Sequence, residues 1–159
     1  MTLASGPSLH LTWKELACRD RFRSPYPLDW RDTRGRIVGA NFDAVREECS
    51  REVESISGGT ITECVLDISE GFRTEAYQAY LRTIPRYKAA LHSQHCEGYA
   101  IDIACPRLLS FIQFVDCVKR ATTHEGSRIQ YIEYRPSMNY IHVDGGGRTN
   151  KKVMEEVVA

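Results

Sequence analysis

The stretch HSQHCEGYAIDIAC, residues 92–105, carries two histidines, a glutamate, an aspartate and two cysteines just before and within a short apolar run. Ile101 and Ile103 share one face of the strand that this run predicts, and Asp102 points to the other face, because side chains alternate along a strand. A carboxylate among apolar neighbours needs a cation or hydrogen-bond donors, since an unpaired buried charge is very costly. The stretch therefore predicts a metal site, a redox pair of cysteines, or a polar loop that meets a core strand.

A second strand-like run, YIHVD at 140–144, repeats the arrangement, with its apolar residues on one face and His142 and Asp144 on the other. If the two runs are neighbouring strands, they offer Asp102, His142 and Asp144 to one point, and His95 can fold back from the preceding loop. Catalytic zinc commonly has three protein ligands drawn from His, Asp and Glu. Spacing alone also leaves room for a plainer arrangement, in which the histidine is an ordinary core or surface residue and the aspartate pairs with an arginine.

The rest of the pattern predicts an α+β fold with a small, mainly antiparallel sheet flanked by helices. Residues 1–36 look irregular, because proline, glycine and charged residues dominate the segment RSPYPLDWRDTRGR at 23–36. Helices are predicted from Asn41 to the SGG at 57–59, over 74–82 with Thr74 as its cap, and over 108–121 with Pro106 in the first turn.

Strands are predicted at 61–69, 128–134 and 139–144, in addition to the run that carries Asp102. The turn residues RPSMN at 135–139 divide the last two strands, which we expect to be antiparallel neighbours. The tail, 149–159, is expected to be a frayed helix.

Composition limits the classes of protein that fit. A chain of 159 residues suits a single domain spanning 1–159, with 42% hydrophobic and 26% charged residues. Its 21 basic and 21 acidic residues cancel, so we expect no binding to nucleic acid or to an anionic membrane. A monomer is expected, although the sequence itself does not determine the oligomeric state. The N-terminus lacks the pattern of a classical secretory signal, which indicates synthesis in the cytoplasm. The six cysteines include no CxxC pair and are expected to be reduced thiols.

The run Ser93-x-His95-x-x-Gly98-x-Ala100-x-Asp102 resembles the SxHxxGxAxD signature of the zinc D-alanyl-D-alanine carboxypeptidase family. Members of this family cleave bacterial cell-wall peptides and share a core with the Hedgehog signalling domain. Three further segments are similar to the family in the same order, so that the resemblance covers roughly residues 11–148. They are LTWKELACRD at 11–20, ISEGFRTEAYQAYL at 68–81, and YIHVD at 140–144, which resembles the closing HxD strand of a compact branch.

The resemblance implies a role for each matching residue. His95, Asp102 and His142 would be the ligands of a Zn²⁺ cofactor, which lowers the pKa of water from about 15.7 to near 7. Arg73 would hold the peptide carbonyl or its developing oxyanion, a task that suits a planar cation. Ser93 would hydrogen-bond to the substrate or brace the loop.

The general base is where the chain departs from the family pattern. Many members place an acidic residue three positions before the last histidine, and here that position is Asn139, whose amide cannot accept a proton from water. In the compact branch the closing aspartate serves instead, which makes Asp144 the expected base. Glu133 is a further candidate. If none of them serves, the domain binds zinc without catalysing well, as Hedgehog domains do.

The sequence thus predicts a zinc metallopeptidase that hydrolyses peptidoglycan stem peptides, as a carboxypeptidase or endopeptidase. Without a recognisable signal, a phage-type lytic protein that is made in the host cytoplasm and acts on the cell wall fits this prediction, and a bacterial protein exported by another route fits it equally. A zinc-stabilised binding module of the same fold is the alternative, and Asn139 favours it. A redox protein that uses Cys96 and Cys105 is a third hypothesis, which predicts reactive thiols and no metal.

Overall fold

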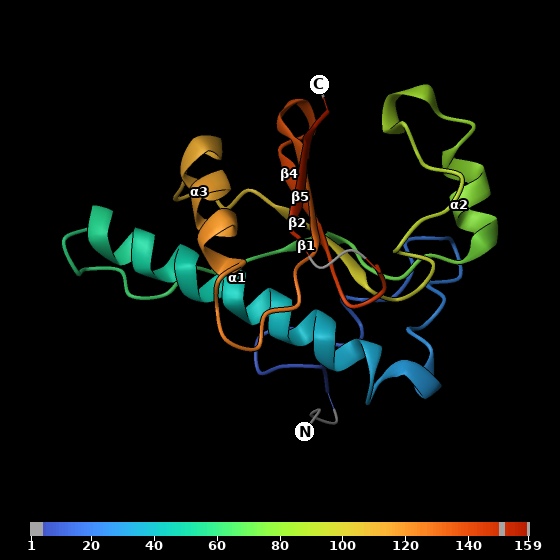
Figure 1. Cartoon of the computed structure of the whole chain (residues 1–159), viewed down its shortest axis with the longest axis horizontal. Helices are drawn as coiled ribbons and strands as arrows, with labels where there is room; N and C mark the ends of the chain where they lie inside the picture. The colour runs from blue at the N-terminus through green and yellow to red at the C-terminus, as the bar shows by residue number, and fades with distance from the viewer. Residues whose placement is uncertain (1–4, 150–151, 159) are drawn as a thin grey trace.

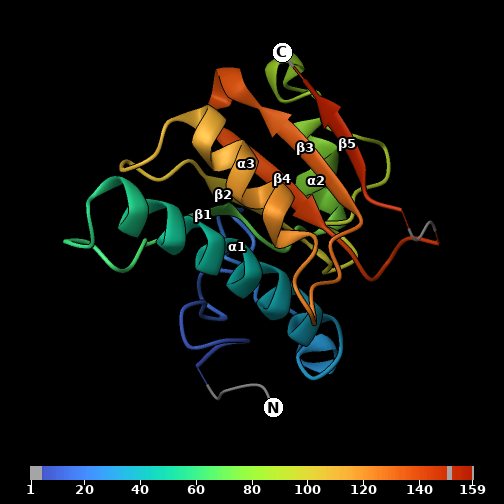
Figure 2. The same cartoon turned by 60° about the vertical axis from the view of Figure 1, so that its left-hand side comes forward.

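A computed structural model describes residues 5–149 and 152–158, which form an α+β fold around one five-stranded sheet. The strand order is β1-β2-β4-β3-β5, which can be followed in Figure 2, where all five strands are labelled. The strands are β1 (Ile68–Glu70), β2 (Ala100–Ala104), β3 (Tyr131–Arg135), β4 (Tyr140–Asp144) and β5 (Met154–Val157). The pairs β1–β2, β2–β4 and β3–β4 are antiparallel, and β5 runs parallel to β3. The predicted α+β class and mainly antiparallel sheet are confirmed, including the β3–β4 hairpin.

The helices divide the space around the sheet into two unlike sides. The elements are α1 (Arg34–Ile56), α2 (Glu75–Leu81) and α3 (Phe111–Ala121), with 3-10 turns at η1 (Leu28–Trp30), η2 (Pro85–Tyr87) and η3 (Pro136–Met138). Helices α1 and α3 pack together over one face of the sheet, whereas α2 lies on the opposite side (Figures 1 and 2). The apolar core, which includes Phe42, Phe114, Ile101, Ile141 and Val143, fills the α1–α3 side. Polar side chains of the same strands are left to face α2.

Helix α1 begins at Arg34, two turns before the predicted start at Asn41. The glycines of this segment favoured a loop in the sequence, yet Gly35 is where the helix meets another part of the chain. A Cβ at Gly35 would lie 2.7 Å from the ring of Trp13, so only glycine permits this close approach. The boundary was wrong because a residue that weakens an isolated helix is needed here for packing.

Helix α3 begins at Phe111, and Pro106 lies in the turn before it, not in its first turn as predicted. The side chain of Ser110 accepts a hydrogen bond from the backbone of Gln113, and the Gln113 side chain accepts one from the Ser110 backbone. This reciprocal capping box satisfies two backbone donors that a helix start leaves unpaired. Ser110 is therefore the N-cap, and the helix begins at the next residue. The S-x-x-Q spacing in the sequence is typical of this capping box and would have predicted the correct start.

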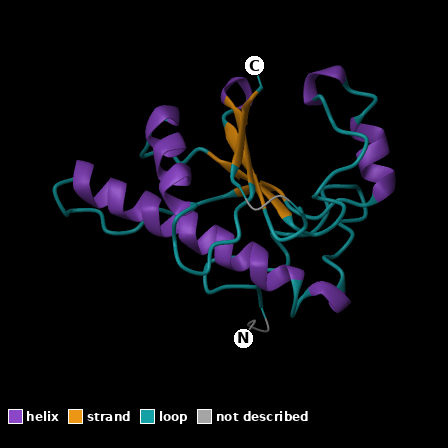
Figure 3. Cartoon of the chain, viewed as in Figure 1, coloured by secondary structure: helices purple, strands orange, loops and turns teal. Residues whose placement is uncertain are grey.

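The strand predicted over 61–69 is paired only at Ile68–Glu70. The predicted faces are nevertheless right, since Cys64 and Leu66 are buried whereas Val65 is 79% exposed. Residues 61–67 have the alternating burial of a strand, but no neighbouring strand of the described chain pairs with them. Alternation alone therefore does not make this segment part of the sheet. From residue 5 to α1 the chain is irregular apart from η1 and one isolated bridge between Ser8 and Leu11, as Figure 3 shows, but Leu11, Leu16 and Tyr26 contribute to the core.

The C-terminal tail is a strand, and the prediction of a frayed helix was wrong. Backbone hydrogen bonds attach β5 to the edge of the sheet, from Met154 N to Gln130 O at 2.9 Å and from Val158 N to Tyr134 O at 2.9 Å. Most β5 side chains are exposed, so the strand leaves no hydrophobic alternation in the sequence. Among the helices that the structure describes, none has the length and apolar character needed to cross a membrane.

Candidate metal centre

Four ionisable side chains form a row across the sheet, on the face that is turned toward α2. In the strand register Glu70 of β1 lies opposite Asp102 of β2, Asp102 opposite His142 of β4, and His142 opposite Glu133 of β3. Residues directly opposite each other on one face have Cβ atoms only about 5 Å apart. The predicted meeting of Asp102 and His142 on neighbouring strands is therefore confirmed, and two glutamates flank this pair.

His95 reaches the row from the loop that precedes β2. The loop turns at Gly98, whose φ of +77° suits glycine, and a Cβ there would lie 2.6 Å from the Trp30 ring. The Tyr26 hydroxyl donates to the Gly98 carbonyl at 2.6 Å, and the Ser93 hydroxyl accepts a hydrogen bond from His95 N at 3.2 Å. Ser93 thus braces the loop, which is one of the two roles predicted for it.

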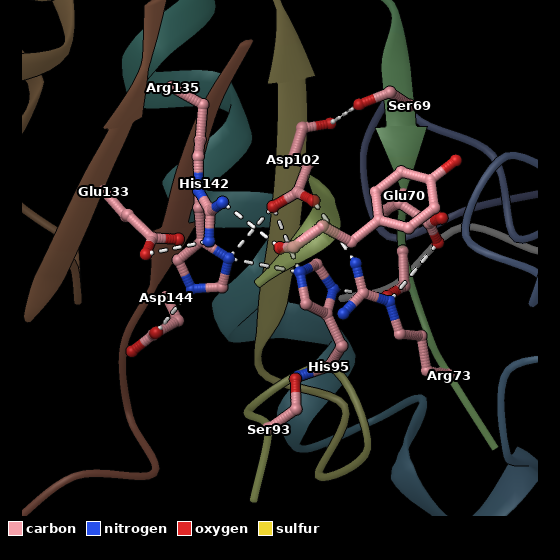
Figure 4. Close-up of polar contacts among 12 residues, drawn as sticks. Ser69, Glu70, Arg73, Ser93, His95, Asp102, Glu133, Arg135, His142 and Asp144 are labelled. Carbon is pink, nitrogen blue, oxygen red and sulfur yellow. Dashed lines mark hydrogen bonds and ion pairs between the residues drawn. The ribbon is translucent and has the colours of Figure 1, made fainter. Parts of the chain in front are cut away.

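The donor atoms of His95, Asp102 and His142 converge at one point (Figure 4). His95 Nε2 lies 3.0 Å from Asp102 Oδ1, His142 Nδ1 lies 2.9 Å from the same oxygen, and the two nitrogens are 3.1 Å apart. All three side chains are buried. The structure therefore brings together the three residues predicted as metal ligands.

Hydrogen bonds behind the two imidazoles determine which ring nitrogens face inward. His95 Nδ1 lies 2.7 Å from the carbonyl oxygen of Gly71, which can only accept, so this nitrogen carries the proton. His142 Nε2 lies 2.7 Å from Asp144 Oδ2 and donates to that carboxylate in the same way. In neutral imidazoles, His95 Nε2 and His142 Nδ1 then turn unprotonated lone pairs toward Asp102. Three electron-rich atoms at this distance repel one another unless a metal ion or a shared proton lies between them.

This geometry fits a divalent metal ion. Ligand atoms about 2.0–2.1 Å from a tetrahedral zinc lie about 3.3 Å from one another, close to the separations found here. The second nitrogen of each histidine is held by an oxygen acceptor, which is the usual outer shell of a metal-bound imidazole. Among the described residues, no fourth histidine, cysteine or carboxylate joins the group. The buried His-Asp-His group can thus hold a metal ion with one coordination position left over.

The two histidines respond differently to their surroundings. Burial, reinforced by the nearby Arg73 charge, lowers the pKa of His95 to about 4. Burial opposes protonation of His142 as well, but hydrogen bonds to Asp102 and Asp144 outweigh it and raise its pKa to about 9. Despite its burial, the pKa of Asp102 is held well below its ordinary value by the two histidines. The surroundings of the two imidazoles therefore shift their pKa values in opposite directions.

Asp144 serves as the anchor of His142. The carboxylate is fully buried, and Arg148 donates to its two oxygens from Nε at 2.6 Å and from Nη2 at 2.7 Å. Although burial acts against it, hydrogen bonds from Arg148 and His142 lower the pKa of Asp144. Each oxygen already accepts a hydrogen bond from a cation or an imidazole, and this arrangement orients the His142 ring. Arg148, four residues beyond Asp144, was not recognised in the sequence.

Arg73 lies beside Asp102, on the side away from His142 (Figure 4). Its Nη1 donates to Gln78 Oε1 at 3.0 Å, its Nη2 is 3.5 Å from Asp102 Oδ2, and its Nε is 3.5 Å from Glu70 Oε2. The side chain is 12% exposed. Burial raises the pKa of Glu70, and the charge of Arg73 opposes this effect. The structure thus places Arg73 next to Asp102, one of the three candidate metal ligands, and its role toward a substrate carbonyl stays a prediction.

An open cleft of about 290 Å³ lies over the three ligand-type residues. Its walls come from α2, η2, the loop before β2, and the polar faces of β3 and β4. The lining includes Arg73, Gln78, Tyr87, Lys88, His92, Ser93, Tyr131, Glu133, Arg135, Tyr140 and Arg148. Glu133 Oε1 accepts a hydrogen bond from Arg135 Nη2 at 3.1 Å, and no hydrogen bond or ion pair within the described chain engages its Oε2. Arg135 follows Glu133 by two positions, which was the signal in YIEYR that it shares the same face.

The other predicted residues lie apart from the ligand group. Asn139 is exposed in a left-handed turn with φ +58°, and its carbonyl accepts a hydrogen bond from Cys105 N at 2.9 Å. Cys96 is next to His95 in sequence, but its thiol points to the carbonyl of Thr74 at 3.9 Å. All six cysteines are free, and burial raises the pKa of Cys96 to about 11. These placements do not assemble a redox pair from Cys96 and Cys105.

Comparisons with known protein families, with curated proteins and with solved structures gave no match to this chain. The peptidase fold therefore stays a prediction, which rests on the motif residues of this sequence. The class that the site itself defines is coarser: an α+β protein with a buried His-Asp-His group able to hold a metal ion at the floor of a cleft.

Proposed function

We propose that this protein is a zinc-dependent peptidase that hydrolyses the stem peptides of peptidoglycan. The observation that carries the proposal is the three-ligand group at the floor of an open cleft. Structural zinc sites are closed by four protein ligands, whereas catalytic sites keep one position for water or substrate. The choice of zinc follows from the two-nitrogen, one-carboxylate donor set, and the choice of peptidoglycan follows from the resemblance of residues 93–102 and 140–144 to the carboxypeptidase signature.

The residues of the cleft have complementary tasks in this reaction. A zinc ion, when bound, would supply a Lewis acid that lowers the pKa of water to about 7. Arg73 stands beside Asp102 and presents a fixed guanidinium to the substrate carbonyl, where negative charge grows in the transition state. Ser93 holds His95 in place through the backbone and reaches the same cleft wall. Hydrolysis also needs an acceptor for the proton of the attacking water.

Glu133 is the residue best placed to accept that proton. One of its oxygens is fixed by Arg135, whereas the other faces the cleft without a partner among the described residues. Asp144, the base expected from the sequence, is fully buried and bound by Arg148 and His142, which suits positioning rather than proton transfer. Glu133 would take a proton from water as the water oxygen bonds to the carbonyl carbon. It would return that proton to the amine as the carbon–nitrogen bond breaks.

The substrate places the site of action at the bacterial cell wall, and a phage-type lytic protein remains our hypothesis for its setting. The second candidate function is a zinc-stabilised binding module with weak catalysis. Two observations favour it: Asn139 occupies the usual position of the base, and Glu133 is paired with Arg135. In that case the cleft would bind peptides and release them unchanged.

Digestion of purified peptidoglycan with mass spectrometry of the products separates the two functions. Wild-type protein with added zinc should release peptide fragments whose masses identify the cleaved bond. His142→Ala should release none and bind no zinc, whereas His92→Ala, which alters a cleft histidine outside the ligand group, should remain active. Zinc binding by the wild type without any fragment, at every pH tested, would exclude the peptidase and leave the binding module.

A further inference from the structure

The cleft over the metal centre is positively charged, although the chain as a whole has 21 basic and 21 acidic residues. Its lining contains four permanently cationic side chains and two carboxylates, and one of those carboxylates is the ligand-type residue Asp102. The lining cations are Arg73, Lys88, Arg135 and Arg148. Charge gathered in a low-dielectric concavity attracts ligands of the opposite sign. The cleft is therefore suited to an anionic ligand in addition to a metal.

Two of these arginines are committed to the centre itself. Arg148 donates to both oxygens of Asp144 and lies over the Tyr131 ring, 4.3 Å from its centroid. Arg73 is shared between Asp102 and Gln78. A buried carboxylate neutralises much of the positive charge of each arginine. Neither arginine is therefore well suited to bind an additional anion.

Arg135 is differently placed. Its side chain is 7% exposed, its Nη1 donates to the Tyr87 carbonyl at 3.1 Å, and Glu133 is its one carboxylate partner among the described residues. Its Nε is buried and has no hydrogen-bond partner within residues 5–149 and 152–158. Lys88 follows Tyr87 directly and lines the same cleft, in a left-handed conformation with φ +48°. The guanidinium is thus fixed to the wall of the cleft that Lys88 also lines, and its partners in the described chain are one neutral carbonyl and one of the two Glu133 oxygens.

We propose that Arg135, with Lys88 at the rim, forms a subsite that binds a carboxylate of the peptide substrate. This inference rests on the proposed function and makes its substrate more specific. A guanidinium held in one orientation recognises a carboxylate far better than the neutral amide of the same shape. If the bound carboxylate is the C-terminus, the enzyme removes terminal residues. If it belongs to an acidic side chain, the enzyme cleaves beside that residue.

The first test is binding of two small probes, N-acetyl-D-alanine and its carboxamide, to the zinc-loaded protein by titration calorimetry. Neither probe has a peptide bond between two residues. The acid should bind about ten- to a hundred-fold more tightly than the amide. Arg135→Gln should abolish this preference and leave zinc affinity unchanged, and Arg135→Lys should retain part of it. Arg86→Gln, an exposed arginine of η2 outside the cleft lining, is the matched control and should behave as wild type.

A second pair of probes, a dipeptide that contains D-Glu and its D-Gln counterpart, identifies the source of the carboxylate. A preference for the D-Glu form that is lost in Arg135→Gln assigns the subsite to a side-chain carboxylate. If Arg135→Gln does not fold, Lys88→Glu changes an exposed side chain and should weaken binding of the acid probe selectively. Equal binding of acid and amide in both pairs by the folded wild type would overturn the inference.

The outcome can be distinguished from failure of the proposed function. Selective binding of the acids without hydrolysis of any stem peptide would support the subsite and exclude the peptidase. Hydrolysis of stem peptides without a preference for the acid probes would support the peptidase and exclude the subsite.

Discussion

His142 donates the hydrogen bond of its Nε2 to Asp144 Oδ2 over 2.7 Å, and this bond turns Nδ1 of the same ring toward the metal position. The hydrogen bond to Asp144 affects more than the orientation of the His142 ring. A carboxylate behind an imidazole fixes the tautomer and strengthens the ring as a metal ligand. The properties of the centre therefore depend on a residue that lies outside the ligand group.

Zinc should stabilise the folded protein through His95, Asp102 and His142. At a free zinc concentration about 100 times Kd, binding should add about 2.7 kcal/mol to the free energy of unfolding. Thermal unfolding with zinc or with a chelator measures this increment. It should vanish in His142→Ala and Asp102→Asn but persist in His92→Ala. A zinc increment that survives in His142→Ala would place the metal elsewhere.

Asp144→Asn should weaken zinc binding by about ten- to a hundred-fold, because the amide cannot fix His142 through a charged hydrogen bond. Competition with a zinc chelator provides the affinity. Asp67→Asn, an exposed aspartate away from the cleft, is the control and should bind zinc as the wild type does. If Asp144→Asn keeps full zinc affinity and loses only its hydrolysis rate, Asp144 is the base after all.

Glu133→Gln should lower kcat on a cleaved stem peptide by about 10²–10⁴-fold, the usual contribution of a positioned acid or base. Zinc affinity should not change, because Glu133 does not belong to the ligand group. The measurements are steady-state kinetics and chelator competition on the same preparation. Glu70→Gln, at the opposite end of the row, tests the alternative carboxylate. A fully active Glu133→Gln variant would remove Glu133 from the proposed mechanism.

Glu48 should make the stability of the fold sensitive to acid. This buried carboxylate joins α1 to α3 by accepting hydrogen bonds from His124 Nε2 at 2.7 Å and Arg120 Nε at 3.0 Å. Burial acts against ionisation, but these two partners outweigh it and lower the pKa of Glu48 from its ordinary 4.5. A lowered folded-state pKa contributes stability above the unfolded value that is lost as the pH falls. The decline should therefore occur below about pH 4.5.

Denaturant unfolding of Glu48→Gln between pH 3 and 7 checks this prediction. The variant should lose about 1–3 kcal/mol at neutral pH, because Arg120 and His124 lose a charged partner. The loss should shrink in acid, where the wild-type carboxylate is protonated. Glu54→Gln changes an exposed glutamate of the same helix and should follow the wild-type curve. A constant loss at all pH values would argue against a role for the ionised carboxylate.

Cys96 should react slowly with alkylating reagents at pH 8, because burial raises its pKa to about 11 and the thiolate is the reactive form. Mass spectrometry of timed iodoacetamide reactions gives the rate at each cysteine, and the denatured protein provides the reference. Cys96→Ser should bind zinc as the wild type does. Rapid alkylation of Cys96 in the folded protein would revive the redox hypothesis.

The side-chain alternation in AIDIA and YIHVD was sufficient to predict two strands and the face of each that carries Asp102 or His142, whereas the pairing of these two strands was only assumed and is shown by the structure. The position of His95 could be predicted through the signature that ends at Asp102, since loop geometry is not encoded in periodicity. Residues that lie opposite each other on paired strands could not be predicted from the sequence, because the strand register was not known. Glu70 could be placed opposite Asp102 only once the β1–β2 pairing was known.

The missed parts of the fold share a physical cause. β5 is held by backbone hydrogen bonds to β3 and buries little, so it leaves no trace in the hydrophobic pattern. The start of α1 was predicted too late because Gly35 has a low helix propensity. Gly35 is needed there because its missing side chain leaves room for the Trp13 ring. Both β5 and the start of α1 depend on contacts between segments that are distant in the chain. A local sequence pattern carries no information about such contacts.

The register between β2 and β4 ties the metal centre to correct folding. Because side chains alternate, a slip of one residue in β4 would turn His142 into the apolar core and bring Ile141 to the cleft. A sheet paired in the wrong register therefore lacks the third candidate ligand, and a bound metal ion would add its binding energy only to the correctly paired sheet. Metal binding would therefore stabilise the correctly paired sheet selectively. The sheet in which β4 has slipped by one residue would gain no stability from the metal.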